Sequence, residues 1–123
     1  MRDITFTVPC YNSEDYMERC IDSLLAGDEY VEIIIVDDGS TDGTGEIADN
    51  YARNYPEVVR VVHQENGGHG AGVNAGLALA TGRYFKVVDS DDWLDEDELQ
   101  KLIRNIRKWE KSGTVVDLVI CNY

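Results

Sequence analysis

The sequence predicts an α/β fold: a three-layer α/β/α sandwich built on a mostly parallel sheet. Two observations lead to this prediction. Short apolar runs rich in valine and isoleucine alternate along the chain with longer segments whose apolar residues recur at helical spacing. The 123 residues are enough for one domain of this kind. Right-handed crossovers then favour the strand order 3-2-1-4, with a switch point between the first and fourth strands.

The expected strands are apolar runs bounded by proline, glycine or acidic residues. They are Ile4–Val8, Val31–Val36, Val58–Val62, Phe85–Val88 and Val115–Cys121. Pro9 is expected to end the first strand, because proline has no N–H to donate to a sheet ladder. The second strand is apolar apart from Glu32, which is typical of a central strand covered on both faces.

The expected helices lie between these strands and are delimited by capping and breaking residues. The predicted boundaries are a cap at Asn12 or Ser13 and a stop at Gly27 for the first helix, a stop at Pro56 for the second, a stop near Gly82 for the third, and a cap at Asp95 for the fourth. A glycine-dense loop at residues 66–72 precedes the third helix.

Composition limits the classes of partner. The formal net charge is −13, which argues against nucleic acid and against an anionic membrane surface, since both attract clustered positive charge. The three cysteines form no CxxC pair and favour reduced thiols in a cytosolic protein. No apolar run approaches the length of a membrane span. We therefore expect a cytoplasmic protein, with the inner face of the membrane as an alternative for a full-length form.

The richest chemistry lies where the fourth strand ends. An apolar run stops at Val88 and is followed by three carboxylates, Asp89, Asp91 and Asp92. In parallel sheets, ligands bind outside the carboxyl ends of the strands. On an extended segment Asp89 and Asp91 would project to one side and Ser90 to the other. Paired hard oxygen donors suit Mg²⁺ or Mn²⁺, especially an ion that also carries a diphosphate. The alternative is a solvated acidic loop that caps the next helix.

Other nucleotide and metal motifs are absent. The turn after the first strand is Pro9-Cys10-Tyr11-Asn12, without the GxGxxG of a dinucleotide fold, and no Walker P-loop or EF-hand spacing occurs. A haloacid-dehalogenase-like phosphatase also has Asp-x-Asp after an apolar strand, but its nucleophile is expected on the first strand. A catalytically silent nucleotide- or metal-binding domain stays open as well.

Four motifs together resemble the family 2 glycosyltransferases in order and spacing, from Ile4 to about Leu99. They are Val8-Pro9-Cys10-Tyr11-Asn12, Ile35-Val36-Asp37-Asp38-Gly39-Ser40-Thr41-Asp42, Asn66-Gly67-Gly68 with Asn74-Ala75-Gly76, and Val88-Asp89-Ser90-Asp91-Asp92. The resemblance implies a Rossmann-like GT-A fold, a nucleotide-diphospho-sugar donor, with UDP favoured, and a Mn²⁺ or Mg²⁺ ion. It also implies sugar transfer, with inversion, to the hydroxyl of a saccharide or lipid-linked acceptor.

The resemblance assigns roles by position. Tyr11 would lie against the base with Pro9 at its edge, and Asp38 would accept a hydrogen bond from a base N–H such as that of uracil. Asp91 would contact the metal directly, and Asp89 would bind the ribose or the metal and its waters. Further nucleotide contacts would come from Asn66 and Gly72.

Neighbouring polar residues have simpler interpretations. Asp37 is expected to act partly as a turn residue, and Thr41 or Asp42 to cap the second helix. A single loop histidine such as His69 is usually solvated, and Lys86 alternates into a strand face.

Two departures from the family pattern stand out. Many relatives have Ala-Arg-Asn where this chain has Gly72-Val73-Asn74, so His69 or the amino end of the third helix would have to replace the basic residue. The general base of inverting members is expected beyond Tyr123. Residues 1–123 are thus expected to be the nucleotide-sugar-binding part, without the acceptor-binding part, and apolar surface left uncovered could support a homodimer.

Overall fold

The computed structural model describes residues 3–111 and shows strands and helices in strict alternation. The elements are β1 (Ile4–Cys10), α1 (Met17–Leu25), the short 3-10 helix η1 (Asp28–Tyr30), β2 (Val31–Asp38), α2 (Thr44–Asn54), β3 (Val59–Gln64), α3 (His69–Leu79), β4 (Tyr84–Val87) and α4 (Glu96–Lys111). The predicted fifth strand, Val115–Cys121, lies outside the described residues.

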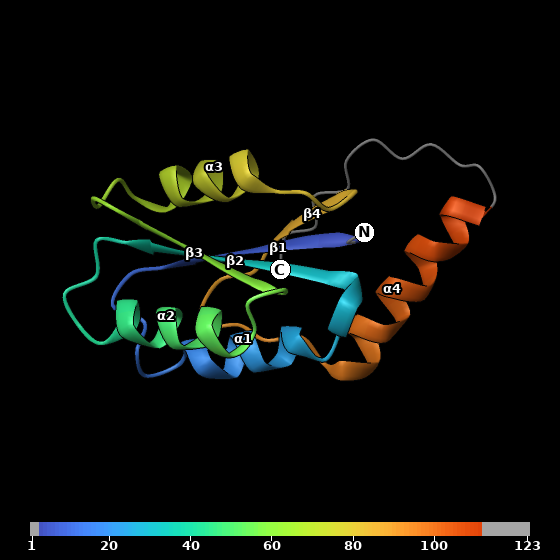
Figure 1. Ribbon diagram of the computed structural model, residues 1–123, viewed down its shortest axis with the longest axis horizontal. Coiled ribbons are helices and arrows are strands. Elements are labelled where there is room, and N and C mark those ends of the chain that lie inside the picture. The colour runs from blue at the N-terminus through green and yellow to red at the C-terminus, as the bar shows by residue number, and fades with distance from the viewer. Residues whose placement is uncertain (1–2, 112–123) are drawn as a thin grey trace.

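The described strands form one parallel sheet in the order β3-β2-β1-β4, so the predicted topology is confirmed. The third crossover carries the chain from β3 over the sheet to β4, on the face opposite the first two crossovers. Figure 1 shows the result, with α3 on one face and α1 and α2 on the other. The switch point lies between β1 and β4, as expected from this order.

The face covered by α1, α2 and α4 holds the larger core. Strand side chains that point to this face pack against the apolar stripes of the three helices. The stripe of α1 is buried as the spacing predicted, and α4 adds Leu99, Ile103 and Ile106. Asp95 caps α4, since its Oδ1 accepts from the N–H of Asp97 at 2.8 Å.

The α3 face is packed by small residues. A Cβ on Gly76 would lie 2.3 Å from both Oγ1 and Cγ2 of Thr7, and a Cβ on Gly72 would lie 3.1 Å from Cβ of Pro9. Glycine at these two positions lets the backbone of α3 approach β1 closely. The first half of α3 therefore lies directly against Pro9, near the carboxyl end of β1.

Several predicted boundaries are wrong. Strands β2 and β3 each run two residues further than predicted, to Asp38 and Gln64. Two other differences concern residues expected to break or cap an element. The first strand continues through Pro9, which pairs with Val36 of β2. The Thr7 carbonyl points toward β4, where it accepts from the Val88 N–H, and an N–H at Pro9 would point the same way. The pairing of β1 with β4 ends at Thr7, so the N–H that proline lacks would have no strand partner. Helix α1 begins at Met17 and has no side-chain cap, because Asn12 and Ser13 make longer-range contacts.

None of the helices within residues 3–111 has the length and apolar content needed to cross a membrane.

Candidate functional site

A cleft of about 180 Å³ opens at the carboxyl ends of β1 and β2. Its lining comes from the end of β1, the end of β2 and the loop before α3, and consists of Pro9, Cys10, Tyr11, Asp38, Asn66, Gly68 and His69. Tyr11 is 52% exposed, so its ring is available to a ligand. Four residues predicted to bind nucleotide (Pro9, Tyr11, Asp38 and Asn66) thus lie together.

Asp38 organises the glycine-dense loop. Its Oδ1 accepts from the Gln64 side-chain amide and the Gly67 N–H, and its Oδ2 accepts from the Gly68 N–H, all at 2.9 Å. These bonds, with that from Gln64 the strongest influence, hold the pKa of Asp38 below its usual value against the opposing effect of burial. A carboxylate offers about four acceptor sites. One acceptor site is thus left for a ligand N–H.

The backbone around Asp38 is equally constrained. Asn66 donates from Nδ2 to the Asp38 carbonyl at 3.0 Å. Gly39 has a φ of 74°, and a Cβ there would lie 2.7 Å from the Asn66 nitrogen, so only glycine fits. The end of β2 and the loop before α3 therefore form one unit.

The three carboxylates after β4 form a turn rather than an extended segment, which corrects the expected alternation. The Asp92 N–H donates to the Asp89 carbonyl at 2.9 Å, and this closes the turn. One carboxylate oxygen from each of Asp89, Asp91 and Asp92 lies within 4.8 Å of the others. Asp92 was not among the predicted ligands, although the run of acids in the sequence already contained the signal.

This donor set fits a hard divalent cation. Oxygen ligands of Mg²⁺ lie about 2.1 Å from the ion and so up to about 4.2 Å from each other. The oxygens of exposed Asp91 and half-buried Asp89 and Asp92, within 4.8 Å of one another, are close to that spacing. Carboxylates alone are also the ligands expected for Mn²⁺.

Helix α1 and the turn before it fix the carboxylate turn in place. The Ser90 hydroxyl contacts the Ser13 hydroxyl at 2.9 Å in a buried position, and the Leu94 N–H donates to the Ser23 hydroxyl at 3.1 Å. The Arg19 guanidinium lies 3.4 Å from the centre of the Trp93 ring, a cation–π contact. The three carboxylates are therefore presented by a supported segment.

His69 connects the two halves of the site. It is the first residue of α3, lines the cleft, and its Nε2 lies 3.7 Å from Oδ1 of Asp89. The sequence left two interpretations of this histidine, a solvated loop residue or a replacement for the basic residue that many relatives have near the diphosphate. It is exposed, but its position places it between the cleft and the carboxylates. Only the chain crossover over the sheet brings it there.

Two predicted residues lie outside the cleft lining. Gly72 is a buried residue of α3 that faces Pro9 of β1, where it serves the packing described above. Asp89 belongs to the carboxylate turn. Cys10 does line the cleft, but burial, with the charge of Asp37, raises the pKa of its thiol to about 12, so it stays protonated.

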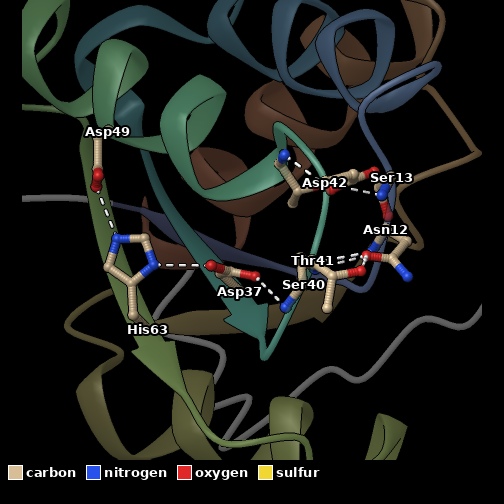
Figure 2. A network of polar contacts seen from close by, with 9 residues as sticks. Asn12, Ser13, Asp37, Ser40, Thr41, Asp42, Asp49 and His63 are labelled. Atoms are coloured by element: carbon tan, nitrogen blue, oxygen red, sulfur yellow. Dashed lines mark hydrogen bonds and ion pairs between the residues drawn. The ribbon is translucent and has the colours of Figure 1, made fainter.

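Asp37 has the turn role predicted for it, whereas the amino-terminal cap position of α2 is Gly43 and not the predicted Thr41 or Asp42. Asp37 Oδ1 accepts from the Ser40 N–H at 3.0 Å, and Asp42 Oδ1 accepts from the Thr44 N–H at 2.9 Å at the start of α2. Asp37 also faces His63, with 2.8 Å between Oδ2 and Nδ1 (Figure 2). That contact was not predicted.

Comparison with known proteins agrees with this geometry. The model of the family described as "Glycosyl transferase family 2" matches residues 5–123. Glycosyltransferase GlyG of Streptococcus pneumoniae is 41% identical over 122 residues, which cover 98% of this chain and 38% of GlyG.

Solved structures give the same result. TarS of S. aureus in complex with UDP-GlcNAc superposes with a TM-score of 0.76 at 34% identity, over 89% of this chain and 32% of that one. The mannosyltransferase PcManGT of Pyrobaculum calidifontis, in complex with GDP-Man and Mn²⁺, has a TM-score of 0.71 at 30% identity, over 80% of this chain and 31% of that one.

This chain spans less than half the length of each of these relatives. The predicted α/β fold of the GT-A type is confirmed by these neighbours. Because the family model covers nearly the whole sequence, the chain belongs to family 2 of the glycosyl transferases.

Proposed function

We propose that this chain is the donor-binding part of a glycosyltransferase that uses a nucleotide-diphospho-sugar together with Mn²⁺ or Mg²⁺. Tyr11, Pro9 and Asn66 bind the nucleoside, Asp38 accepts a hydrogen bond from the base, and Asp91 and Asp89 hold the cation with help from Asp92. Family membership sets aside the phosphatase considered from the sequence.

The observation that carries the proposal is the adjacency of the cleft and the carboxylate turn at one edge of the sheet. His69 lines the cleft, and its Nε2 lies 3.7 Å from Oδ1 of Asp89. A ligand that fills the cleft and extends past His69 would therefore bring its extending group to the three carboxylates. A nucleoside followed by a diphosphate has that layout. Among the similar structures, TarS is in complex with UDP-GlcNAc and PcManGT with GDP-Man and Mn²⁺.

The chemistry follows from charge. A cation bound at Asp91 and Asp89 would neutralise the diphosphate as it leaves the sugar. We expect this segment by itself to repel a diphosphate, since residues 89–98 include seven acids, counting Asp89 and Glu98. We expect the acceptor-binding part and the general base beyond Tyr123, and transfer with inversion to a saccharide or lipid-linked hydroxyl. A cytoplasmic location and a homodimer also stay predictions.

Calorimetry of UDP with and without Mn²⁺ tests the proposal. Metal and nucleotide should each raise the other's affinity by the same factor, typically about 5- to 150-fold, or about 1–3 kcal/mol. Asp91→Asn keeps the shape but removes the charged ligand, and should abolish most of that gain. GDP in the same titration tests the preference for UDP.

Asp97→Asn is the matched control, because Asp97 is an exposed acid in the first turn of α4 and is not part of the carboxylate turn. It should bind Mn²⁺ and UDP like the parent. Equal UDP affinity with and without metal in the parent, or full metal coupling in Asp91→Asn, would contradict the proposed metal site.

A further inference from the structure

His63 bridges two carboxylates from different elements. Its Nδ1 lies 2.8 Å from Oδ2 of Asp37 at the end of β2, and its Nε2 lies 2.8 Å from Oδ1 of Asp49 on α2 (Figure 2). A neutral imidazole has one N–H and can donate to only one of them. Both contacts are hydrogen bonds only when the ring is an imidazolium, so the geometry itself indicates a positive charge.

The positive charge on His63 lies next to the buried carboxylate of Asp37. Asp37 is 7% exposed, and a carboxylate removed from water is costly without a partner. Asp37 sits directly opposite His63 in the β2–β3 register, and Asp38 sits opposite Gln64. Because side chains alternate along a strand, one aspartate faces His63 and the next faces the cleft.

Asp37 also hydrogen-bonds to the turn that follows β2. Its second oxygen accepts from the Ser40 N–H at 3.0 Å. The Ser40 hydroxyl accepts from the Asn12 N–H at 3.0 Å, and the Thr41 N–H donates to Oδ1 of Asn12 at 2.8 Å. These bonds hold Asn12 in a left-handed conformation, with a φ of 48°.

Asn12 lies between the two residues that reach both halves of the candidate site. Tyr11 before it lines the cleft. Ser13 after it contacts Ser90 in the carboxylate turn at 2.9 Å, and its hydroxyl accepts from the Tyr11 N–H at 3.2 Å. A continuous path of short contacts therefore joins His63 to Tyr11 in the cleft wall and to Ser90 in the carboxylate turn.

We propose that His63 is a positioning residue for the nucleotide-diphosphate site: by bridging Asp49 and Asp37 it holds the Asp37–Ser40–Asn12 path, and so sets Tyr11 and Ser13. His63 touches no ligand itself. This inference rests on the proposed function, and it adds a dependence on pH that the cleft and the carboxylate turn do not require.

The direction of that dependence follows from the groups that face His63, which are Asp37 from β2 and Asp49 from α2. Hydrogen bonds to Asp37 and then Asp49 raise the pKa of His63 above its ordinary value of 6.5, against the opposing effect of burial. A raised pKa means that the stabilisation is complete below 6.5 and is lost as the pH rises through the folded-state pKa. Nucleotide affinity should weaken in the same interval.

The test is calorimetry of UDP with Mn²⁺ on the 123-residue chain and on His63→Gln, from about pH 6 to about pH 9, the range around histidine titration. UDP and the metal have their own pH effects, so the measured quantity is the ratio of parent to variant affinity at each pH. At low pH this ratio should be about 2- to 30-fold, the usual range for coupling through a network. It should fall to one as the pH rises.

Two further variants separate positioning from general damage. Asp49→Asn removes one of the two charges that favour the imidazolium, so the fall in the ratio should move to lower pH. Glu46→Gln removes an exposed carboxylate from the first turn of the same helix and should leave the profile of the parent unchanged.

A nuclear magnetic resonance titration of the unliganded chain keeps the inference testable should His63→Gln unfold. The amide signals of Asn12 and Tyr11 should titrate with the same midpoint as the His63 ring. Amides that stay silent through that midpoint, or His63→Gln affinities equal to the parent at every pH, overturn the positioning role. A parent that binds no UDP–Mn²⁺ at any pH overturns the proposed function, and the unliganded titration still decides the path from His63 to Asn12.

Discussion

Asp37 and Asp38 are adjacent carboxylates at the end of β2 with different partners. The strand turns Asp37 to α2 and His63, and it turns Asp38 to the loop before α3. Both are nearly buried, and both are held by short bonds to N–H groups. Replacing either one therefore disturbs the fold as well as the site.

Asp38→Asn should lower stability by about 1–3 kcal/mol, because an amide brings a donor against the N–H donors of Gly67, Gly68 or Gln64 and leaves a buried group unpaired. Urea unfolding with an unchanged slope measures this. Since the pKa of Asp38 is lowered, the difference from the parent should be full above its ordinary value of 3.8 and shrink as the pH falls through the folded-state pKa.

Asp91→Asn is the control for that experiment, since an exposed acid in a cluster of acids should change stability by less than about 0.5 kcal/mol. In titrations, Asp38→Asn should weaken uridine and UDP alike, whereas Asp91→Asn should affect only the metal-dependent part. Unchanged stability in Asp38→Asn would mean that its three bonds are not maintained in solution.

Helix α3 shows how an element positions the site through packing. The helix is apolar around most of its circumference, and its glycines lie against Thr7 and Pro9 of β1. Its first residue, His69, is thereby set between the cleft and Asp89. Widening the gap between α3 and β1 would move that residue.

Gly76→Ala and Gly70→Ala form a matched pair on this helix. A Cβ at 76 meets Thr7 at 2.3 Å, so overpacking should cost about 1–3 kcal/mol, more than the gain of about 1 kcal/mol in helix propensity. A Cβ at 70 has no atom within 4 Å, so there the propensity gain should appear alone. Thermal unfolding of both variants measures the pair. Equal shifts of the same sign would contradict the close packing of α3 on β1.

At the scale of the whole molecule, the sheet order gathers the ends of β1, β2 and β4 at one edge, although their residues are far apart in the chain. The chain covers about a third of the solved relatives. All residues proposed to bind the donor lie within the described part, so we propose that donor binding can be measured on this chain apart from acceptor chemistry.

The 123-residue chain should therefore bind UDP with Mn²⁺ and transfer sugar to acceptors negligibly, since the general base is expected beyond Tyr123. Product formation from a radiolabelled UDP-sugar with simple saccharide acceptors measures this, with slow donor hydrolysis as the permitted background. Efficient transfer would show that the base lies within these residues.

The sequence by itself determined the layers, the strand order and the edge of the sheet at which the site lies. Those features depend on hydrophobic periodicity and on crossover handedness, which act locally and have one dominant outcome. The same topology placed Tyr11 and Asp38 at this crevice, whereas Asn66 was assigned by the family resemblance, and all three line the cleft.

Only the tertiary structure decided how the polar side chains pair. The turn at residues 89–92 gathers Asp92 with Asp89 and Asp91, Asn12 binds Thr41 instead of capping α1, and His63 faces Asp37 from the next strand. Each of these contacts depends on strand register or on a turn closing, and a single-residue shift would change the partner. Side-chain hydrogen bonds between distant segments have no fixed spacing along a sequence, so the partners of Asn12 and His63 appear only once the chain is folded.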